Sequence, residues 1–230
     1  FGSTFINYFG GLGLALLYNA KCVKWKRVWR IFPMLAYAIP SFITLRAFNF
    51  MFCDAGPIVG LLKEWKWVDS NFTIISFDSK WSIRLLGFFC CAWISIPSIM
   101  FLSTGILSNA NNDMYEAARL DGANGFQQFL YLTLPFVLFA TTPIIISTFI
   151  ANFNNFSIFY FLRPEETLVS GYFNANSADL LINWMYRLTV DKKLYALGSA
   201  LSLILFAFMA IFSLIVYVSS PAYKKEDTYK

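Results

Sequence analysis

Histidine is absent from this chain, and charged residues make up only 13% of its 230 positions. The absence of imidazole excludes His-dependent catalytic triads, His metal sites and imidazole proton relays. Cysteine is also scarce: Cys22, Cys53, Cys90 and Cys91 have no metal-binding or redox spacing, so no structural disulfide is expected. Because most of the apparatus of an enzyme is missing, we expect a protein that is not an enzyme, with no cofactor and no metal ion.

Apolar residues, in contrast, are abundant. Hydrophobic residues account for 58% of the chain and aromatic residues for 20%, and the mean hydropathy is +0.57. These values lie well outside the range of soluble globular domains. They predict an all-α integral membrane protein in contact with membrane lipid. The pI near 9.0 is attributed to orientation in the membrane, so no nucleic-acid partner is expected.

Five charge-poor stretches are long enough to cross a bilayer, for which about 20 apolar residues suffice. They are 1–20, 31–53, 81–107, about 126–162, and 194–223. The charge-free run 122–162 would be about 60 Å long as one straight helix, roughly twice the hydrocarbon thickness. We therefore expect Pro135 and Pro143 to mark where it bends or enters the membrane. Pro33 and Pro40 predict a kink in the second stretch.

Basic residues orient the chain, because Lys and Arg near span ends are retained in the cytoplasm. Five of them crowd one loop: Lys21, Lys24, Lys26, Arg27 and Arg30. With alternating crossings, 54–80 and 163–193 are predicted to be external, and 108–125 and the tail internal. We expect one multi-pass membrane domain over 1–230. The chain opens in an apolar stretch without an initiator Met, so we expect it to lack one or more N-terminal spans.

Gly10, Gly11 and Gly13 superficially resemble a dinucleotide-binding loop. They lie inside the first apolar stretch, with no preceding strand and no acidic partner for a ribose. We therefore expect them to allow close packing between helices.

A short polar segment follows the third apolar stretch. The residues 111–113, Asn-Asn-Asp, followed by Glu116 fit a helix N-cap with a capping-box acid at the third helical position. Capping alone leaves unexplained why Ala117, Ala118, Gly122 and Ala123 offer so small a surface. Small side chains suit an element that fits a partner's cleft, so we predict a coupling surface. A plain interfacial helix is the alternative.

The spacing of this segment is specific. Glu116-Ala117-Ala118, then Gly122, then Leu132-x-Leu134-Pro135 resembles the cytoplasmic coupling motif of binding-protein-dependent ABC importers, with Leu132 where Ile is usual. The stretches 37–43, 152–156 and 178–187 resemble the maltose/maltodextrin permease subunit of the MalF type, and the similarity runs over essentially the whole chain. The resemblance implies the helix bundle of an ABC importer transmembrane domain, with a cytoplasmic coupling helix, in the bacterial cytoplasmic membrane.

The resemblance also implies partners and a function. The partners are a second permease subunit in a heterodimer, two ATP-binding subunits that carry out ATP hydrolysis, and an extracytoplasmic sugar-binding protein. The chain would form half of the pathway for maltose, maltodextrin or a related oligosaccharide. The residues it assigns to ATPase coupling are Glu116, Ala117, Ala118, Asp121, Gly122 and Pro135. Glu116 would face a basic residue in the ATPase cleft.

Four uncharged polar residues suggest where a sugar sits. Thr141, Thr148, Asn152 and Asn155 are spaced by seven, four and three residues, which places them on one face of a helix. Hydroxyls and amides can bind a neutral polyhydroxylated solute without a strong charge interaction. The alternative is hydrogen bonding between helices.

The family's sugar contacts match Thr148, Asn152 and Asn155 independently of this spacing argument. Further family contacts align with Ile94, Ser95, Ser98 and Ser157. Ser98 stands where the maltose permease has a sugar-stacking tyrosine, which weakens the case for maltose itself and leaves the exact sugar open.

A secondary transporter driven by an ion gradient is the competing function. Such carriers commonly place Asp, Glu or His in mid-membrane, and the five apolar stretches contain none of these residues. The segment 163–193 is expected to be either a docking loop for the binding protein or a solvated loop of no special role.

Overall fold

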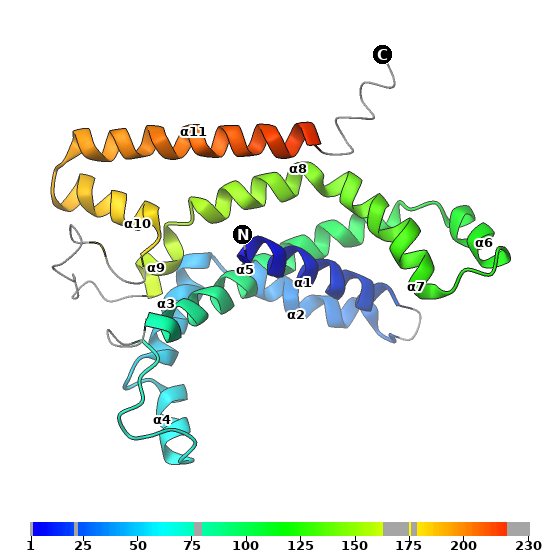
Figure 1. Cartoon of the computed structure of the whole chain (residues 1–230). Helices are drawn as coiled ribbons and strands as arrows, with labels where there is room; N and C mark the ends of the chain where they lie inside the picture. The colour runs from blue at the N-terminus through cyan, green and yellow to red at the C-terminus, as the bar shows by residue number, and fades with distance from the viewer. Residues whose placement is uncertain (1, 21–22, 76–79, 163–174, 176–178, 220–230) are drawn as a thin grey trace.

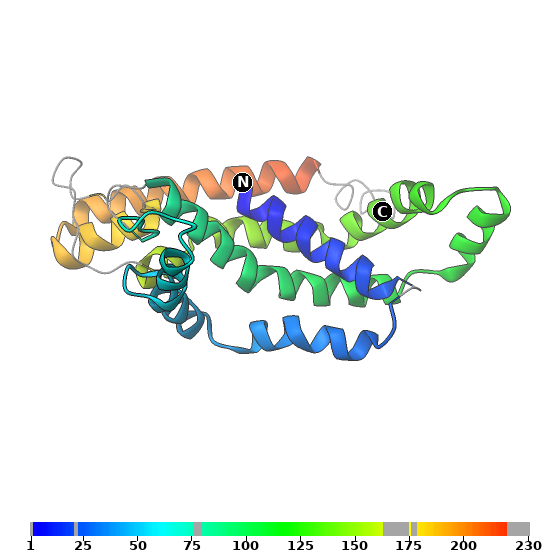
Figure 2. The same cartoon turned by 90° about the horizontal axis from the view of Figure 1, so that it is seen from below.

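The computed structural model describes residues 2–20, 23–75, 80–162, 175 and 179–219, and all regular secondary structure in this part of the chain is helical. The elements are α1 (Gly2–Asn19), α2 (Lys26–Ala38), α3 (Ser41–Phe52), α4 (Pro57–Glu64), α5 (Lys80–Ser108), α6 (Asn112–Leu120), α7 (Gly125–Gln128), the π-helical turn η1 (Phe129–Thr133), α8 (Leu134–Phe153), α9 (Ser157–Leu162), α10 (Leu181–Tyr186), the π-helical turn η2 (Arg187–Asp191) and α11 (Tyr195–Ser219). The long helices lie side by side in an elongated bundle (Figures 1 and 2).

Four helical segments of the described chain are long and apolar enough to cross a membrane: Ser41–Glu64, Trp81–Ser108, Gly125–Phe153 and Tyr195–Ser219. The predicted all-α, multi-pass membrane class is confirmed. The expected count of five differs from this result because α1 is not among the four. Thr4, Asn7 and Tyr8 lower the hydropathy of α1, and all three are buried inside the bundle. Helix α1 is therefore less apolar than a lipid-facing span but well suited to packing against its neighbours.

The expected second span, 31–53, is two helices. Helix α2 ends at Ala38 and α3 begins at Ser41, with Ile39 in an extended conformation and Pro40 in the break. Pro33 lies inside α2. Proline disfavours a helical residue before it and lacks the N–H that a helix needs, so the predicted kink is a full interruption at Pro40.

The charge-free run 122–162 both bends and is divided, and the two features fall at different places. The π-helical turn η1 comes immediately before the start of α8, with Pro135 in the first turn of α8 and Pro143 inside that helix. The chain bends along this segment (Figure 1). The helix ends at Phe153, and α9 begins only at Ser157. The division of the run therefore falls at residues 154–156 and not at a proline.

Close helix packing holds α1 in the bundle. A Cβ atom built on Gly11 would lie 2.7 Å from Cβ of Ile99, and one on Gly10 would lie 2.9 Å from Cδ1 of Ile96. The expected role of these two glycines is confirmed, whereas Gly13 faces open space. Around this contact, Tyr8, Leu12, Ile99 and Val137 form an apolar cluster that joins α1, α5 and α8.

Two further clusters complete the packing. Leu45, Leu86, Cys90 and Ile158 join α3, α5 and α9, whereas Phe149, Met185, Leu205 and Met209 join α8, α10 and α11. The outer side of α11 leaves large apolar side chains exposed, including Leu203, Ile204, Phe206, Leu214 and Ile215. Such a surface suits lipid or a partner subunit rather than water.

The elements divide between the two ends of the bundle as alternating crossings predict. The α1–α2 connection and α6 lie at one end, and α3, α4, α9 and α10 lie toward the other (Figures 1 and 2). The expected basic loop is partly helical, because Lys26, Arg27 and Arg30 belong to the first turns of α2. Lys26 Nζ donates to the backbone oxygen of Asn19 at 2.8 Å, and Arg30 Nη2 donates to Asn19 Oδ1 at 2.9 Å. These cations thus stabilise the C-terminus of α1.

Candidate functional site

Helix α6 carries the predicted coupling residues, and its start differs from the expected capping box. Asn111 is the N-cap, and its side chain accepts a hydrogen bond from the Asp113 N–H at 2.9 Å. Glu116 is therefore the fifth helical residue rather than the third, and its side chain is exposed. A capping box with Glu116 requires Asp113 as the N-cap. The interpretation is wrong because Asn111 caps the helix instead. A true capping box occurs at α7, where Asn124 and Gln127 bond reciprocally.

The end of α6 is fixed by its backbone. The Gly122 N–H donates to the Arg119 oxygen at 3.0 Å, and the Ala123 N–H donates to the Ala118 oxygen at 2.9 Å. Gly122 has φ +82°, and a Cβ atom there would meet nothing within 4 Å. This is a Schellman motif, in which glycine is favoured because L residues strain at positive φ. Gly122 therefore has a conformational reason to be glycine, and its predicted contact with a partner stays a prediction.

Helix α6 projects from the end of the bundle (Figure 1), and a side-chain hydrogen bond ties it to η1. The Tyr115 hydroxyl lies 3.1 Å from Thr133 Oγ1 in η1. Glu116, Ala117 and Asp121 are exposed, and Leu120 is 89% exposed. The element is thus locally complete, with caps at both ends, yet it leaves an apolar and acidic face uncovered.

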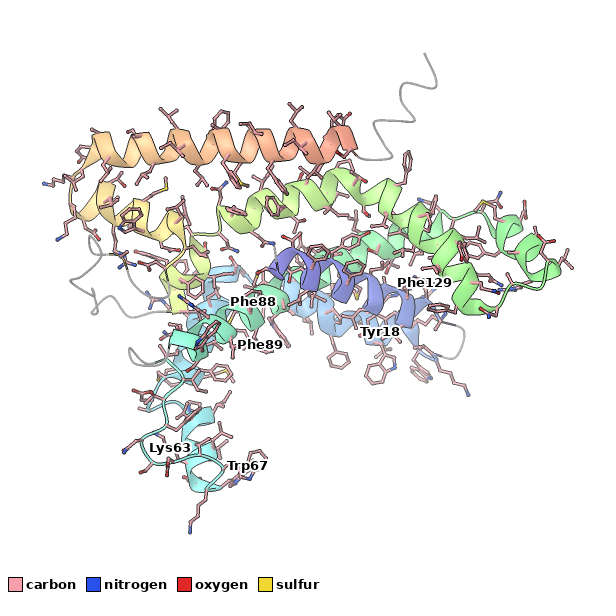
Figure 3. All side chains as sticks on the ribbon, viewed as in Figure 1. Tyr18, Lys63, Trp67, Phe88, Phe89 and Phe129 are labelled. Carbon is pink, nitrogen blue, oxygen red and sulfur yellow. The ribbon has the colours of Figure 1, made fainter. Side chains whose placement is uncertain are left out.

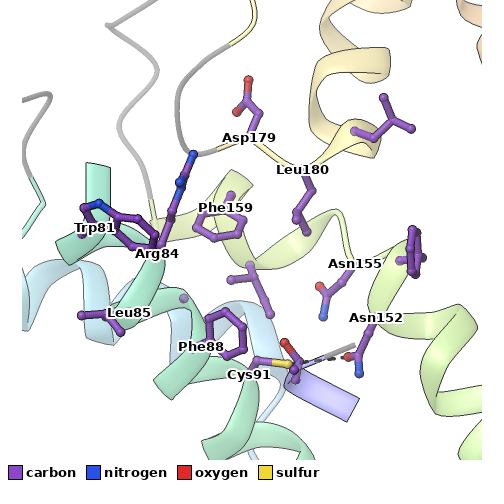
Figure 4. A pocket seen from close by; sticks show the side chains of 16 residues that line it. Trp81, Arg84, Leu85, Phe88, Cys91, Asn152, Asn155, Phe159, Asp179 and Leu180 are labelled. Carbon is purple, nitrogen blue, oxygen red and sulfur yellow. Dashed lines mark hydrogen bonds between the residues drawn. The ribbon is translucent and has the colours of Figure 1, made fainter. Parts of the chain in front are cut away.

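At the opposite end, a cavity of about 500 Å³ opens between α5, the end of α8 and α9. Its aromatic lining includes Trp81, Phe88 and Phe159, and its uncharged polar lining includes the amides of Asn152 and Asn155 (Figure 4). Arg84 and Asp179 also line it. The Arg84 guanidinium lies 5.5 Å from the centre of the Trp81 ring, and Asp179 forms an ion pair with Arg187.

Asn152 links its own helix, α8, to α1 and α5 beside the cavity. Its Nδ2 donates to Thr4 Oγ1 of α1 at 3.0 Å. Its Oδ1 accepts from Cys91 Sγ of α5 at 3.6 Å (Figure 4). Asn7 Nδ2 donates to the same sulfur at 3.5 Å. Asn152 therefore lines the cavity and also makes the hydrogen bonds between helices that were the alternative explanation for its polarity.

The four polar residues that were predicted to share one helical face do not all meet in the structure. Because α8 ends at Phe153, Asn155 does not continue its face and reaches the cavity from the following link. Thr141 is fully buried, and its hydroxyl lies 2.6 Å from the Tyr8 hydroxyl. Thr148 is half-buried in α8 and is not among the described residues that line the cavity. Of these four residues, only Asn152 and Asn155 are among the described residues that line the cavity.

The remaining predicted sugar contacts also lie elsewhere. Ile94 packs beside the cluster of α3, α5 and α9, and Ser98 Oγ donates to the Ser95 backbone oxygen at 2.9 Å within α5. Ser157 begins α9. None of Ile94, Ser95, Ser98 and Ser157 is among the described residues that line the cavity.

Sequence reasoning did not select Trp81, Arg84 or Phe88 as part of a site. A signal was present, because Trp81 and Arg84 are three residues apart at the start of an apolar stretch, which places them on one helical face. Thr4 and Asn7 carried no comparable signal. Their partners are more than eighty residues away in the sequence.

The sequence of this chain matches a known protein family, described as binding-protein-dependent transport system inner membrane component, over residues 8–225. It is 34% identical over 226 residues to the galactooligosaccharides transport system permease protein GanP of Bacillus subtilis, covering 94% of this chain and 51% of the relative. It is 29% identical over 223 residues to the maltose/maltodextrin transport system permease protein MalF of Escherichia coli, covering 93% and 42%.

The fold matches that of solved transporters. A crystal structure of a bacterial alginate ABC transporter, in complex with an alginate pentasaccharide-bound periplasmic protein, contains a chain with a TM-score of 0.74 and 16% identity. The match covers 94% of this chain and 73% of that one. The chain spans about half the length of the curated relatives it matches.

Proposed function

The chain belongs to the family of binding-protein-dependent transport system inner membrane components, and from that premise we propose that it is the permease subunit of an ABC importer and forms half of a pathway for an oligosaccharide. It is a multi-pass protein of the inner membrane. Its relatives are permease proteins named for galactooligosaccharides and for maltodextrin. The observation that carries the proposal is the convergence of Asn152 and Asn155 on one aromatic-walled cavity.

The chemistry of this cavity suits a sugar. Its volume of about 500 Å³ lies within the range of small-molecule sites. Amide groups donate and accept hydrogen bonds with hydroxyls and carry no charge, while Trp81, Phe88 and Phe159 offer apolar faces for the sugar ring. The bonded hydroxyl of Ser98 lies in α5 outside this lining. Our proposal is a maltodextrin or a related oligosaccharide, with Asn152 and Asn155 as direct contacts.

Energy for transport would enter through α6. We place the exposed face of Glu116, Ala117 and Leu120 in a cleft of an ATP-binding subunit, where ATP is hydrolysed. Residues 125–153 form one helical segment about 40 Å long at 1.5 Å per residue. It starts just after α6 and ends at the cavity. A movement of α6 would therefore be carried to Asn152 along one continuous helical segment through Pro135, as a two-state machine requires.

The whole assembly follows from the same premise. We propose a second permease subunit as a heterodimer partner, two ATP-binding subunits and an extracytoplasmic sugar-binding protein, with residues 1–230 as one permease domain. A related fold is found together with a periplasmic protein in the alginate transporter. The predicted docking segment 163–193 lies mostly outside the described residues. Family membership leaves the alternative of an ion-gradient carrier without support.

The test compares two variants that break the same bond between helices. Asn152→Leu removes the bonds to Thr4 and Cys91 together with the amide offered to the sugar, whereas Thr4→Val removes only the bond between Thr4 and Asn152. An unpaired sugar hydroxyl costs about 1–3 kcal/mol, so Asn152→Leu should lower uptake per assembled complex roughly tenfold to hundredfold. Thr4→Val should keep uptake near that of the unmodified protein. Uptake of several oligosaccharides, normalised to complex in the membrane, is the measurement.

If both variants lower the amount of complex but leave normalised uptake and sugar preference unchanged, Asn152 serves packing and the proposed sugar site is wrong. Asn155→Leu provides an independent check, because Asn155 lines the same cavity from the link after α8.

A further inference from the structure

The corner between α1 and α2 concentrates positive charge. Lys24, Lys26, Arg27 and Arg30 fall within seven residues, and no Asp or Glu occurs anywhere from residue 1 to residue 53. Lys24 and Arg27 are exposed, while Lys26 and Arg30 bond to Asn19 at the end of α1. The oxygens of Asn19 thus engage two of the cations, and the other two lie at the surface with no carboxylate nearby in the sequence.

Hydrogen-bond donors at this corner exceed the acceptors. Arg30 Nε and Asn19 Nδ2 are buried donors that have no hydrogen-bond acceptor among the residues the structure describes. Buried N–H groups are seldom left without a partner, so each such group calls for an explanation. A multivalent anion with several oxygens would supply what this corner lacks.

An apolar groove of about 460 Å³ lies between α1, α2 and α5, and the described residues that line it include no charged side chain. Leu14 and Tyr18 of α1, Phe32 and Ala36 of α2, and Phe89 and Trp93 of α5 line it. Tyr18 is the neighbour of Asn19 in the sequence, and Phe89 lies farther along the bundle on the same side (Figure 3). One end of the groove therefore lies at Tyr18, next to the Asn19 that Lys26 and Arg30 contact, and the rest of its lining is apolar.

We propose that this groove and its basic corner bind one anionic phospholipid, with the phosphate at Lys24, Arg27 and Arg30 and an acyl chain between α1, α2 and α5. The arrangement has the polarity of a lipid, because a phosphate sits at the membrane interface while its chains extend into the hydrocarbon. Clusters of four or more Lys and Arg next to a membrane helix attract anionic lipids, at about 1 kcal/mol per cation.

A free phosphate would use only the basic corner, and a protein partner would use the groove without needing the cations. The continuity of the two features favours a lipid over both. This inference does not depend on the identity of the transported sugar, so it can fail while the proposed transport function stands.

The experiment uses the whole permease complex in nanodiscs that contain phosphatidylglycerol or phosphatidylcholine, with bound lipid counted by native mass spectrometry. The lipid site predicts retained phosphatidylglycerol and little retained phosphatidylcholine. Lys24→Gln combined with Arg27→Gln should lower phosphatidylglycerol retention roughly tenfold to thirtyfold, from about 1 kcal/mol for each cation. Ala36→Trp, which fills the groove, should also lower retention.

Lys192→Gln combined with Lys193→Gln is the matched control, because both residues are exposed and lie after η2 toward the opposite end of the bundle. The control removes the same charge and should retain the lipid. Equal retention of the two lipids, or an equal loss in the control, would overturn the proposal. Competition by inorganic phosphate at millimolar concentration would identify a free-anion site instead. Crosslinking of a photoreactive residue at position 36 to another protein subunit, rather than to lipid, would show that a protein covers the groove.

Discussion

Helices α1 and α6 both place polar and small residues in an apolar chain, but they use them in opposite ways. In α1, Thr4, Asn7 and Tyr8 are buried, and each bonds to a side chain of α5 or α8. In α6, Glu116 and Ala117 are exposed, and the helix satisfies its own ends with Asn111 and Gly122. The polar residues of α1 therefore serve packing between helices, whereas those of α6 stay available for the partner that we propose.

The glycines of the two helices show the same contrast. Gly11 is small because Ile99 leaves no room for a side chain. Gly122 has open space around it and is glycine because its φ is +82°. A substitution at Gly11 would disturb contacts between helices, whereas one at Gly122 would disturb only the backbone of α6.

Glu116→Lys should have the largest effect, and on transport alone. Reversing the charge in a desolvated cleft of a partner costs several kcal/mol, so uptake should fall by more than tenfold, with loss of coupling to ATP hydrolysis or weaker ATPase association. The stability of the permease itself should not change, because Glu116 is exposed. Glu64→Lys in α4 is the control, since Glu64 is also exposed but lies toward the other end. Normal uptake with the ATPase still bound would show that α6 is an ordinary interfacial helix.

Gly11→Val should instead act on assembly. The new Cβ would lie 2.7 Å from Cβ of Ile99 and 3.0 Å from the Ile96 backbone oxygen, and overpacking of this kind costs about 1–3 kcal/mol or more. Thermal unfolding of the purified complex should show a clearly lower midpoint. Gly13→Val is the matched control, because nothing lies within 4 Å of its Cβ position. Equal loss in both variants would mean that helix propensity, and not contact with α5, decides the result.

Gly122→Ala should weaken α6 without affecting the bundle. An L residue at positive φ costs about 1–2 kcal/mol, so the last turn of α6 should exchange its amide hydrogens faster while α1 and α5 remain protected. Gly122→Asn should be milder, because Asn tolerates this conformation. Gly125→Ala is the control, since its backbone shows no positive φ and its surroundings are open. If packing against the bundle governed Gly122, unfolding of the whole complex would shift instead.

Tyr115→Phe should give the smallest effect. It removes the hydroxyl that lies 3.1 Å from Thr133 Oγ1, a bond that contributes about 1 kcal/mol. The tether between α6 and η1 should loosen, and ATP hydrolysed per sugar transported should rise modestly. A double-mutant cycle with Thr133→Val isolates the bond. Additive effects of the two substitutions would show that this hydrogen bond does not couple α6 to the long helix.

Much of the fold could be predicted from the sequence. Composition and run length predicted the membrane class. The prolines of the second apolar stretch predicted the break near Pro40, and the small residues predicted the close approach of Gly10 and Gly11. The pattern Glu116-Ala117-Ala118 with Gly122 located α6 and indicated the family. These features depend on neighbouring residues, on short-range helix geometry or on the average solvent of a segment, so one chain is enough to reveal them.

The candidate site was predicted only in part. Residues at helical spacing share one face only as long as the helix continues. Helix α8 ends at Phe153, so Asn155 reaches the cavity from a link rather than along the predicted face. Thr141 had the right spacing, but Tyr8 from a distant part of the chain bonds to it. The Ser98 hydroxyl donates to the backbone oxygen of Ser95 within α5.

By itself, the sequence determined that the chain lies in a membrane and which segments are helical, because hydropathy and helix capping act over short distances. The tertiary structure alone decided which polar groups meet. Asn152 touches Thr4 and Cys91, and Trp81 and Arg84 share a cavity with Asn155, although these residues are far apart in the sequence. The physical reason is that a buried polar group must find its partner on another helix, and only the packing of the helices determines which helix that is.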